Sequence, residues 1–144
     1  MKNGRIVVIA GFLILLALFG YSYYANQATA PPTEDKAPSN AAEEIEQAEK
    51  NGESMWLLFR STTCAPCIEM QKVFDQLEPD YKGKVRFMAI DVNDPNNSDI
   101  LKSWKIQYIP TTFIIDGGSG NISYQNVGVI PTDDLKKELN KVVE

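Results

Sequence analysis

The sequence predicts a mixed α/β domain over residues 41–144, in which a central four-stranded sheet is flanked by helices in the order αβαβαββα. Two short apolar runs, 55–60 and 84–91, are typical of strands buried on both faces, and an amphipathic helical pattern separates them. A glycine-rich turn at 117–120 joins two further strand patterns into a hairpin. A strand–helix–strand unit followed by a hairpin and a closing helix implies a mixed parallel and antiparallel sheet, covered by helices on both faces.

The first half of the domain places a helix on either side of the first strand. Ser39 or Asn40 can cap a helix over 41–50, whose first turn is acidic and whose end is marked by Gly52. After the first strand, a second helix covers 68–78 and continues the segment that holds the cysteines. The apolar residues of this helix lie mostly three and four positions apart, as one buried face requires. They are Ile68, Met70, Val73, Phe74 and Leu77.

The second half alternates in a similar way. The expected elements are a strand over 84–91, a short helix over 96–106, strands over 111–116 and 121–128, and a closing helix over 133–144. Thr132 offers an N-cap for the closing helix. The side chains expected on the buried face of that helix are Leu135, Leu139 and Val142.

An uncharged apolar segment, residues 6–24, precedes the domain. As a helix its 19 residues would span about 28 Å, close to the thickness of a bilayer's hydrocarbon core. Lys2 and Arg5 lie before it, and basic residues stay on the cytoplasmic side, so everything after Tyr24 is expected outside the cytoplasm. Residues 1–24 are therefore predicted to be a membrane anchor or a signal segment.

Retention and cleavage of this segment both remain open. The small residues at 28–30 resemble a signal-peptide cleavage site, but Pro31 follows directly and disfavours cleavage. Residues 25–40 contain three prolines and few large apolar side chains, which predicts a flexible tether. We expect either a single-pass membrane protein with its domain outside the cytoplasm or a secreted domain.

The charge of the chain excludes some classes of partner. Of its 14 basic and 19 acidic residues, Lys2 and Arg5 belong to the membrane-directed segment, which leaves 12 basic and 19 acidic residues and a net charge of −7. Nucleic acids and anionic membrane surfaces both require a basic face. We therefore expect no nucleic-acid partner, and contact with the membrane only through the N-terminal segment.

The chain has only two cysteines, Cys64 and Cys67, and no histidine. A zinc or iron–sulfur site normally needs four cysteine or histidine ligands, so no metal site is expected within one chain. A structural disulfide is reasonable outside the cytoplasm. However, a disulfide that closes a loop of only four residues restricts the unfolded chain very little and stabilises the fold by only about 2 kcal/mol. The third alternative is a redox-active pair.

The placement of the pair favours redox chemistry. The first strand ends at Arg60 and a helix begins within the cysteine motif, so Cys64 is expected at a helix N-terminus. Unpaired N–H groups and the helix dipole stabilise a thiolate there, and Pro66 fits the first helical turn. Cys67, three residues later, returns to the same helix face at a more shielded position. An exposed thiolate backed by a shielded thiol is the arrangement that thiol–disulfide exchange requires.

With these motifs the domain resembles the thioredoxin family. The resemblance covers residues 41–144 and rests on the C-A-P-C motif after a buried strand, on I-P-T-T-F beginning 42 residues past Cys67, and on V-G before the last helix. It implies a thioredoxin fold, a cis peptide bond between Ile109 and Pro110, and pairing of the Ile109 backbone with an extended substrate segment. The substrate-binding residues that it implies are Ala65, Pro66, Ile109, Pro110, Thr111 and Gly128.

The sequence departs from common thioredoxins at several positions. Thr63 stands in place of the usual Trp before the motif, and Ala65 in place of Gly. The buried Asp and Lys of the family are replaced by Leu58 and Phe87, so both charges are absent. No strand pattern is visible before Asn40, where the family has an additional strand. These departures favour a specialised extracytoplasmic protein over a general cytoplasmic thioredoxin.

The resemblance implies a thiol–disulfide oxidoreductase that acts on protein partners. Cys64 would attack the partner's disulfide and Cys67 would resolve the mixed disulfide, and no cofactor is expected besides this pair. Ala-Pro between the cysteines is nearer the reducing Gly-Pro type than the oxidising Pro-His type, which favours a reductase. Electrons would come from a membrane transporter of the CcdA or DsbD kind, for substrates in cytochrome c maturation or envelope thiol homeostasis. The alternative is a non-catalytic peptide-binding adaptor with an inert disulfide.

Overall fold

The structure, a computed structural model, describes residues 40–143. The membrane-directed segment at 6–24 and the tether up to residue 39 lie outside the described residues. Within 40–143, no helix is both long and apolar enough to span a bilayer. The elements are α2 (Ala41–Lys50), β1 (Ser54–Arg60), α3 (Ala65–Tyr81), β2 (Val85–Asp91), the 3₁₀ turn η1 (Pro95–Asn97), α4 (Ser98–Ser103), β3 (Thr111–Ile115), β4 (Ile122–Val127) and α5 (Thr132–Asn140).

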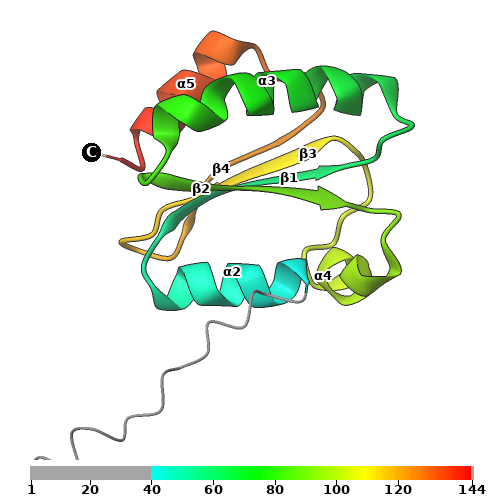
Figure 1. The fold of residues 1–144 in the computed structure, drawn as a ribbon, viewed down its shortest axis with the longest axis horizontal. Helices are drawn as coiled ribbons and strands as arrows, with labels where there is room; N and C mark the ends of the chain where they lie inside the picture. Colours follow the sequence, from blue (N-terminus) through cyan, green and yellow to red (C-terminus); the bar gives the residue numbers. More distant parts are fainter. Residues whose placement is uncertain (1–39, 144) are drawn as a thin grey trace, which may run out of the picture. The chain divides into compact units, whose positions relative to one another are not determined.

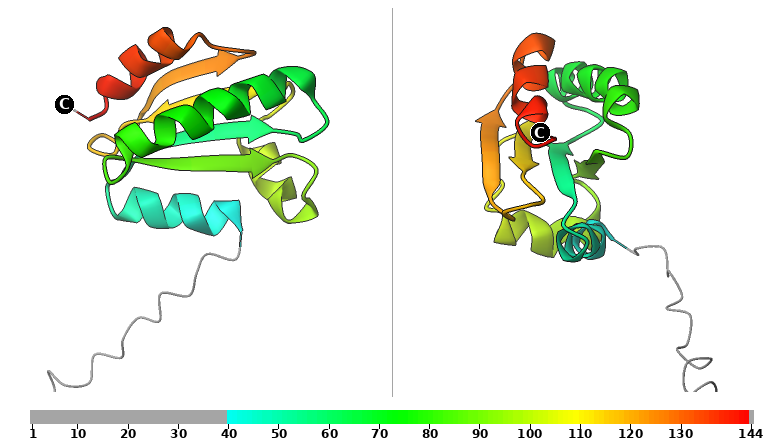
Figure 2. Two further views of the ribbon diagram at one scale, coloured as in Figure 1. Left: turned by 45° about the horizontal axis from the view of Figure 1, so that its top comes forward. Right: turned by 90° about the vertical axis from the view of Figure 1, so that its left-hand side faces the viewer.

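A four-stranded sheet forms the centre of the domain, with the strand order β2-β1-β3-β4 (Figure 1). Strand β1 pairs with β2 in parallel and with β3 antiparallel, and β3 forms an antiparallel hairpin with β4. Helices α3 and α5 cover one face of this sheet, while α2 and α4 cover the other (Figures 1 and 2). The predicted element order αβαβαββα and the mixed sheet between two helical layers are confirmed.

Strand β1 is the centre of two hydrophobic cores. Its first six residues are all buried, because the strand is paired on both edges and covered on both faces. Trp56 and Leu58 belong to the core beneath α3 and α5. Met55, Leu57 and Phe59 belong to the core beneath α2 and α4. Burial of these five side chains contributes on the order of 10 kcal/mol, which is comparable to the net stability of a whole domain.

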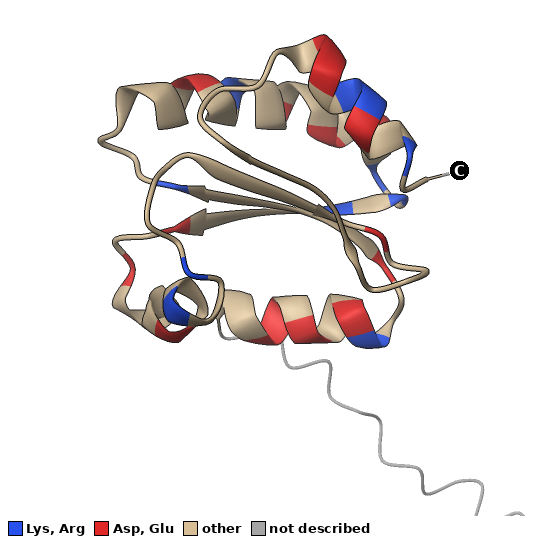
Figure 3. Ribbon diagram, turned by 180° about the vertical axis from the view of Figure 1, so that it is seen from behind, with Lys and Arg blue, Asp and Glu red and all other residues tan. Residues whose placement is uncertain are grey.

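Charged residues lie mainly on the helices and near the strand ends (Figure 3). Helix α2 starts at Ala41 as predicted, and of the two expected caps it is Asn40 whose Oδ1 accepts a hydrogen bond from the Glu43 N–H at 3.0 Å. Glu43 and Glu44 lie in its first turn, where the positive end of the helix dipole stabilises negative charge. The chain then leaves the helix through Gly52, whose φ of 67° suits glycine. The start and end of α2 therefore follow from local sequence signals.

Three local expectations are wrong. Strand β2 is not buried on both faces, because it is an edge strand and Ala89 is exposed. Ile68 does not join the core; its side chain is 46% exposed, because the buried face of α3 runs through Cys67 and Met70 instead. Thr132 is itself the first residue of α5, and no side chain caps that helix.

Leu58 and Phe87, the apolar residues singled out in the sequence, both lie in the core beneath α3. Leu58 has no exposed surface and lies opposite Ala89 on β2. Phe87 is partly buried and lies opposite Trp56, and the centroids of the two rings are 4.8 Å apart in an edge-to-face contact. Both side chains therefore make apolar contacts in this core.

Leu58→Asp should lower the free energy of unfolding by roughly 3–5 kcal/mol at pH 7, because it buries a carboxylate without a cationic partner. Burial raises the pKa of such a carboxyl, so the loss should be smallest below about pH 4, where the group is protonated in both states, and should grow as the pH rises. Leu58→Asn, which has the same shape but does not ionise, should lose stability without this pH dependence. Urea denaturation at several pH values measures both, and an unchanged midpoint for Leu58→Asp at pH 7 would contradict the burial of position 58.

Candidate functional site

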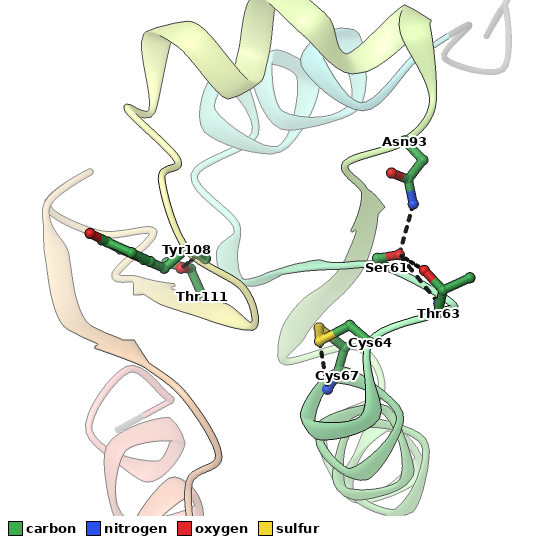
Figure 4. The surroundings of a disulfide bond; sticks show 7 residues. All are labelled: Ser61, Thr63, Cys64, Cys67, Asn93, Tyr108 and Thr111. Atoms are coloured by element: carbon green, nitrogen blue, oxygen red, sulfur yellow. Dashed lines mark hydrogen bonds between the residues drawn. A yellow bond between two sulfur atoms is a disulfide. The ribbon is translucent and has the colours of Figure 1, made fainter.

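The two cysteines form a disulfide at the start of α3, directly after the carboxyl end of β1 (Figure 4). Cys64 is the N-cap residue of this helix, and its Sγ accepts a hydrogen bond from the Cys67 N–H at 3.3 Å. The Cα atoms of the two cysteines are 5.2 Å apart. Pro66 occupies the first helical turn, where its missing N–H leaves no hydrogen bond unmade. The expected placement of the pair at a helix N-terminus is confirmed.

The two cysteines differ in exposure. Cys67 is fully buried and lies on the same face of α3 as Met70. Cys64 is half-buried, and the residues between the cysteines, Ala65 and Pro66, are exposed. A partner can therefore approach Cys64 from solvent while the protein shields Cys67.

The N-terminus of α3 provides the electrostatics of the site. Its first turn contains no acidic residue, so no carboxylate there offsets the positive potential of the helix dipole. The Cys64 sulfur already lies within hydrogen-bond distance of the Cys67 backbone N–H. A negative charge on a reduced Cys64 would be stabilised by both effects, whereas burial disfavours a charge on Cys67.

The loop before β3 lies at the same end of the sheet as the disulfide (Figure 4). Thr111 pairs with Phe59, which brings the start of β3 beside the end of β1. The peptide bond between Ile109 and Pro110 is cis, as expected. Thr111 Oγ1 donates a hydrogen bond to the Tyr108 carbonyl oxygen at 2.6 Å, which closes the turn around the proline.

Gly128 is joined directly to this proline turn. Its N–H donates a hydrogen bond to the Pro110 carbonyl oxygen at 2.8 Å, and the preceding residue, Val127, pairs with Thr111. With a φ of 101°, the Gly128 backbone has a conformation that other residues rarely adopt. Of the residues predicted to bind substrate, those around the proline therefore form one connected group, and those between the cysteines form a second group at the start of α3.

A polar network beside Cys64 is not predicted from the sequence. Ser61 is 4% exposed, and its Oγ accepts a hydrogen bond from Asn93 Nδ2 at 2.7 Å. The same oxygen lies 3.1 Å from Thr63 Oγ1 and accepts a hydrogen bond from the Thr63 N–H at 3.3 Å. Ser61 follows β1 and Asn93 follows β2. The available signal was a pair of polar residues within two positions of the carboxyl ends of two neighbouring parallel strands, which lie at the same end of the sheet.

Large apolar side chains are also exposed on the segments that carry the site. Ile68 on the first turn of α3 is 46% exposed, Tyr108 beside the proline turn is 68% exposed, and Val129 after Gly128 is 42% exposed. The exposure of Tyr108 and Val129 depends on the tertiary structure, and their neighbours in sequence do not indicate it.

The sequence matches the thioredoxin family over residues 35–141. Two relatives named thiol-disulfide oxidoreductase ResA, from Geobacillus thermodenitrificans and Geobacillus kaustophilus, are each 26% identical to it; the matches cover 90% and 98% of this chain and 91% and 98% of the relatives. A thioredoxin from Chlorobaculum thiosulfatiphilum is 32% identical over 58% of this chain and 73% of its own. The crystal structure of chloroplastic thioredoxin z shares the fold, with a TM-score of 0.61 and 24% identity over 69% of this chain and 88% of that one.

These matches agree with the geometry of the domain. This structure combines the expected sheet order with a cysteine pair at the start of α3 and a cis-proline turn at the same end of the sheet. The chain therefore belongs to the thioredoxin family and is a thiol–disulfide oxidoreductase with Cys64 and Cys67 as its C-x-x-C pair.

Proposed function

We propose that this protein reduces disulfide bonds of other proteins on the outer side of the cytoplasmic membrane. The observation that carries the proposal is the asymmetry of the pair: Cys64 is accessible at a helix N-terminus, and Cys67 is buried three residues later. Such a pair can exchange electrons with a partner through one sulfur while the other stays protected. A purely structural disulfide would gain nothing from this difference in exposure.

The reaction consists of two thiol–disulfide exchange steps. In the reduced protein, the Cys64 thiolate attacks one sulfur of the partner's disulfide, which forms a mixed disulfide and releases the other partner sulfur as a thiolate. Cys67 loses its proton to water and attacks Cys64 Sγ, which closes the Cys64–Cys67 disulfide and releases the second partner sulfur. Two electrons pass to the partner, and a donor dithiol must return two electrons to the pair.

The partner would be held by the two groups of residues around the disulfide. The residues to which we assign substrate contact are Ala65, Pro66, Ile109, Pro110, Thr111 and Gly128. An extended segment of the partner would pair with the Ile109 backbone, as in strand addition to a sheet. The hydrogen bonds from Thr111 to Tyr108 and from Gly128 to Pro110 support this assignment, because they hold the loop in one conformation.

The location and the electron source are proposed from the sequence. Residues 6–24 would anchor the chain, and residues 25–40 would let the domain reach its partners. A membrane transporter of the CcdA or DsbD kind would supply electrons, and apocytochromes or other secreted proteins would receive them, in cytochrome c maturation or envelope thiol homeostasis. Ala65 and Pro66 between the cysteines favour this reducing direction. The two ResA relatives, which match over nearly the full chain, support the same type of oxidoreductase.

Alkylation of the reduced protein by iodoacetamide should modify Cys64 faster than Cys67. The rate at Cys64 should reach half of its maximum below about pH 8.5, the value for a free cysteine, because the helix N-terminus stabilises the thiolate. Single Cys64→Ser and Cys67→Ser variants separate the two rates. A faster reaction at Cys67 would reverse the roles assigned to the two cysteines.

Cys67→Ser should accumulate covalent complexes with partner proteins that dithiothreitol dissolves, because nothing within the helix turn can then release the mixed disulfide. Cys64→Ser should accumulate none. Non-reducing gels and mass spectrometry of the trapped proteins measure this. A membrane electron transporter among them would support a reductase, whereas a quinone-linked oxidase would show that electrons flow the other way.

Insulin reduction with dithiothreitol distinguishes the enzyme from an adaptor. The unmodified protein should accelerate the reduction well above a Cys64→Ser control. Equal rates, together with no trapped complexes in Cys67→Ser, would favour the non-catalytic peptide-binding adaptor over the proposed function.

A further inference from the structure

The Ser61 hydroxyl has a complete set of hydrogen bonds. A hydroxyl group has one proton and two lone pairs. Asn93 Nδ2 and the Thr63 backbone N are donors only, at 2.7 and 3.3 Å from Ser61 Oγ, so they occupy both lone pairs. The Ser61 proton is then the one that bridges the 3.1 Å to Thr63 Oγ1. The side-chain hydrogen bonds therefore run in one direction, from Asn93 through Ser61 to Thr63.

This direction excludes one orientation of the Thr63 hydroxyl proton. Thr63 Oγ1 accepts the Ser61 proton, so its own O–H must point away from Ser61. Thr63 is exposed and immediately precedes Cys64. The Thr63 hydroxyl is thus available to donate a hydrogen bond to a partner from the residue next to Cys64.

The network also holds this donor in place. Ser61 is almost fully buried, and a buried hydroxyl without hydrogen bonds would destabilise the fold. Its bond to Asn93 joins the segments that follow β1 and β2, and so it fixes the turn that leads into α3. A donor that is already fixed loses less conformational entropy when it binds a partner than a freely rotating side chain does.

We propose that Thr63 is a specificity-determining residue whose hydroxyl, oriented by Ser61 and Asn93, donates a hydrogen bond to a peptide carbonyl oxygen of the protein joined to Cys64. The inference rests on the proposed function, in which Cys64 forms a mixed disulfide with a protein. In the view of Figure 4, Thr63 and the Tyr108–Thr111 turn lie on opposite sides of Cys64. The partner's backbone would therefore be held on both sides of the exchanging sulfur, and a small disulfide without peptide groups would lack the contact to Thr63.

The test compares a protein disulfide with a small one. Pre-reduced full-length protein in detergent is mixed with insulin or with 4,4′-dithiodipyridine, and the second-order rate constant of its oxidation is measured for each. Thr63→Val keeps the side-chain shape without the hydroxyl; it should lower the insulin constant roughly threefold to tenfold, the value of one neutral hydrogen bond, and leave the dithiodipyridine constant unchanged. Thr63→Ser should restore the insulin constant. Thr62→Val removes an exposed hydroxyl one residue earlier and, as the matched control, should change neither constant.

Asn93→Asp tests the direction of the network. A carboxylate cannot donate a hydrogen bond, so the Ser61 proton would turn towards it and Thr63 would donate inward to Ser61. The added negative charge acts on both oxidants, so the ratio of the insulin constant to the dithiodipyridine constant is the quantity to compare. In this background Thr63→Val should leave the ratio unchanged.

Three results would overturn the assignment of Thr63: an insulin constant unaffected by Thr63→Val, an equal fall for both oxidants, or an undiminished effect of Thr63→Val in the Asn93→Asp background. An unmodified protein that is oxidised by neither compound would instead refute the proposed function, and this inference with it. When the unmodified protein reacts with both, a negative result concerns Thr63 alone.

Discussion

The domain depends on one strand that has to be covered on both faces. Strand β1 is buried along its first six residues and lies between β2 and β3, so its alternate side chains require a helical layer above and below. Helix α3 supplies one of these layers immediately after β1, and its N-terminus therefore lies at the carboxyl end of the strand. The pairing of Phe59 with Thr111 brings the proline turn to the same end of the sheet. The cysteines and the proline share one end of the sheet because of how the core packs.

Features with a local cause could be predicted from the sequence. The apolar run of β1, the capping side chain of Asn40 and the glycines of the hairpin each act within a few residues, and the structure has them where expected. Two of the three failures concern which face an element buries, and the third is the N-cap expected from Thr132. The apolar pattern of β2 resembles that of β1, and only the strand order shows that it is an edge strand with Ala89 exposed. Ile68 fits a helical apolar spacing, but the sheet that α3 meets decides which face is covered.

The residues of the candidate site also differ in whether their cause is local. Cys64, Cys67 and Pro110 belong to short motifs, so they could be named in advance, and the resemblance to the thioredoxin family implied the cis peptide bond. Ser61 and Asn93 are 32 residues apart in sequence, and each is an ordinary polar residue after a strand. Only the parallel pairing of β1 with β2 brings their side chains within hydrogen-bond distance. Groups that strand pairing assembles in this way leave no motif in a single sequence.

The disulfide closes within the first turn of α3, between the residue that caps the helix and one that lies inside it. Folding and reduction of this pair form a thermodynamic cycle. The difference in unfolding free energy between the oxidised and reduced proteins therefore equals, in energy, the difference in reduction potential between the folded and unfolded chains. About 1.4 kcal/mol of extra stability in the reduced form raises the folded pair's potential by about 30 mV. Any interaction that favours a thiolate at the helix start thus makes the protein a stronger oxidant and a weaker reductant. Denaturation measured in the two redox states therefore reports how much the start of α3 changes the reduction potential of the pair.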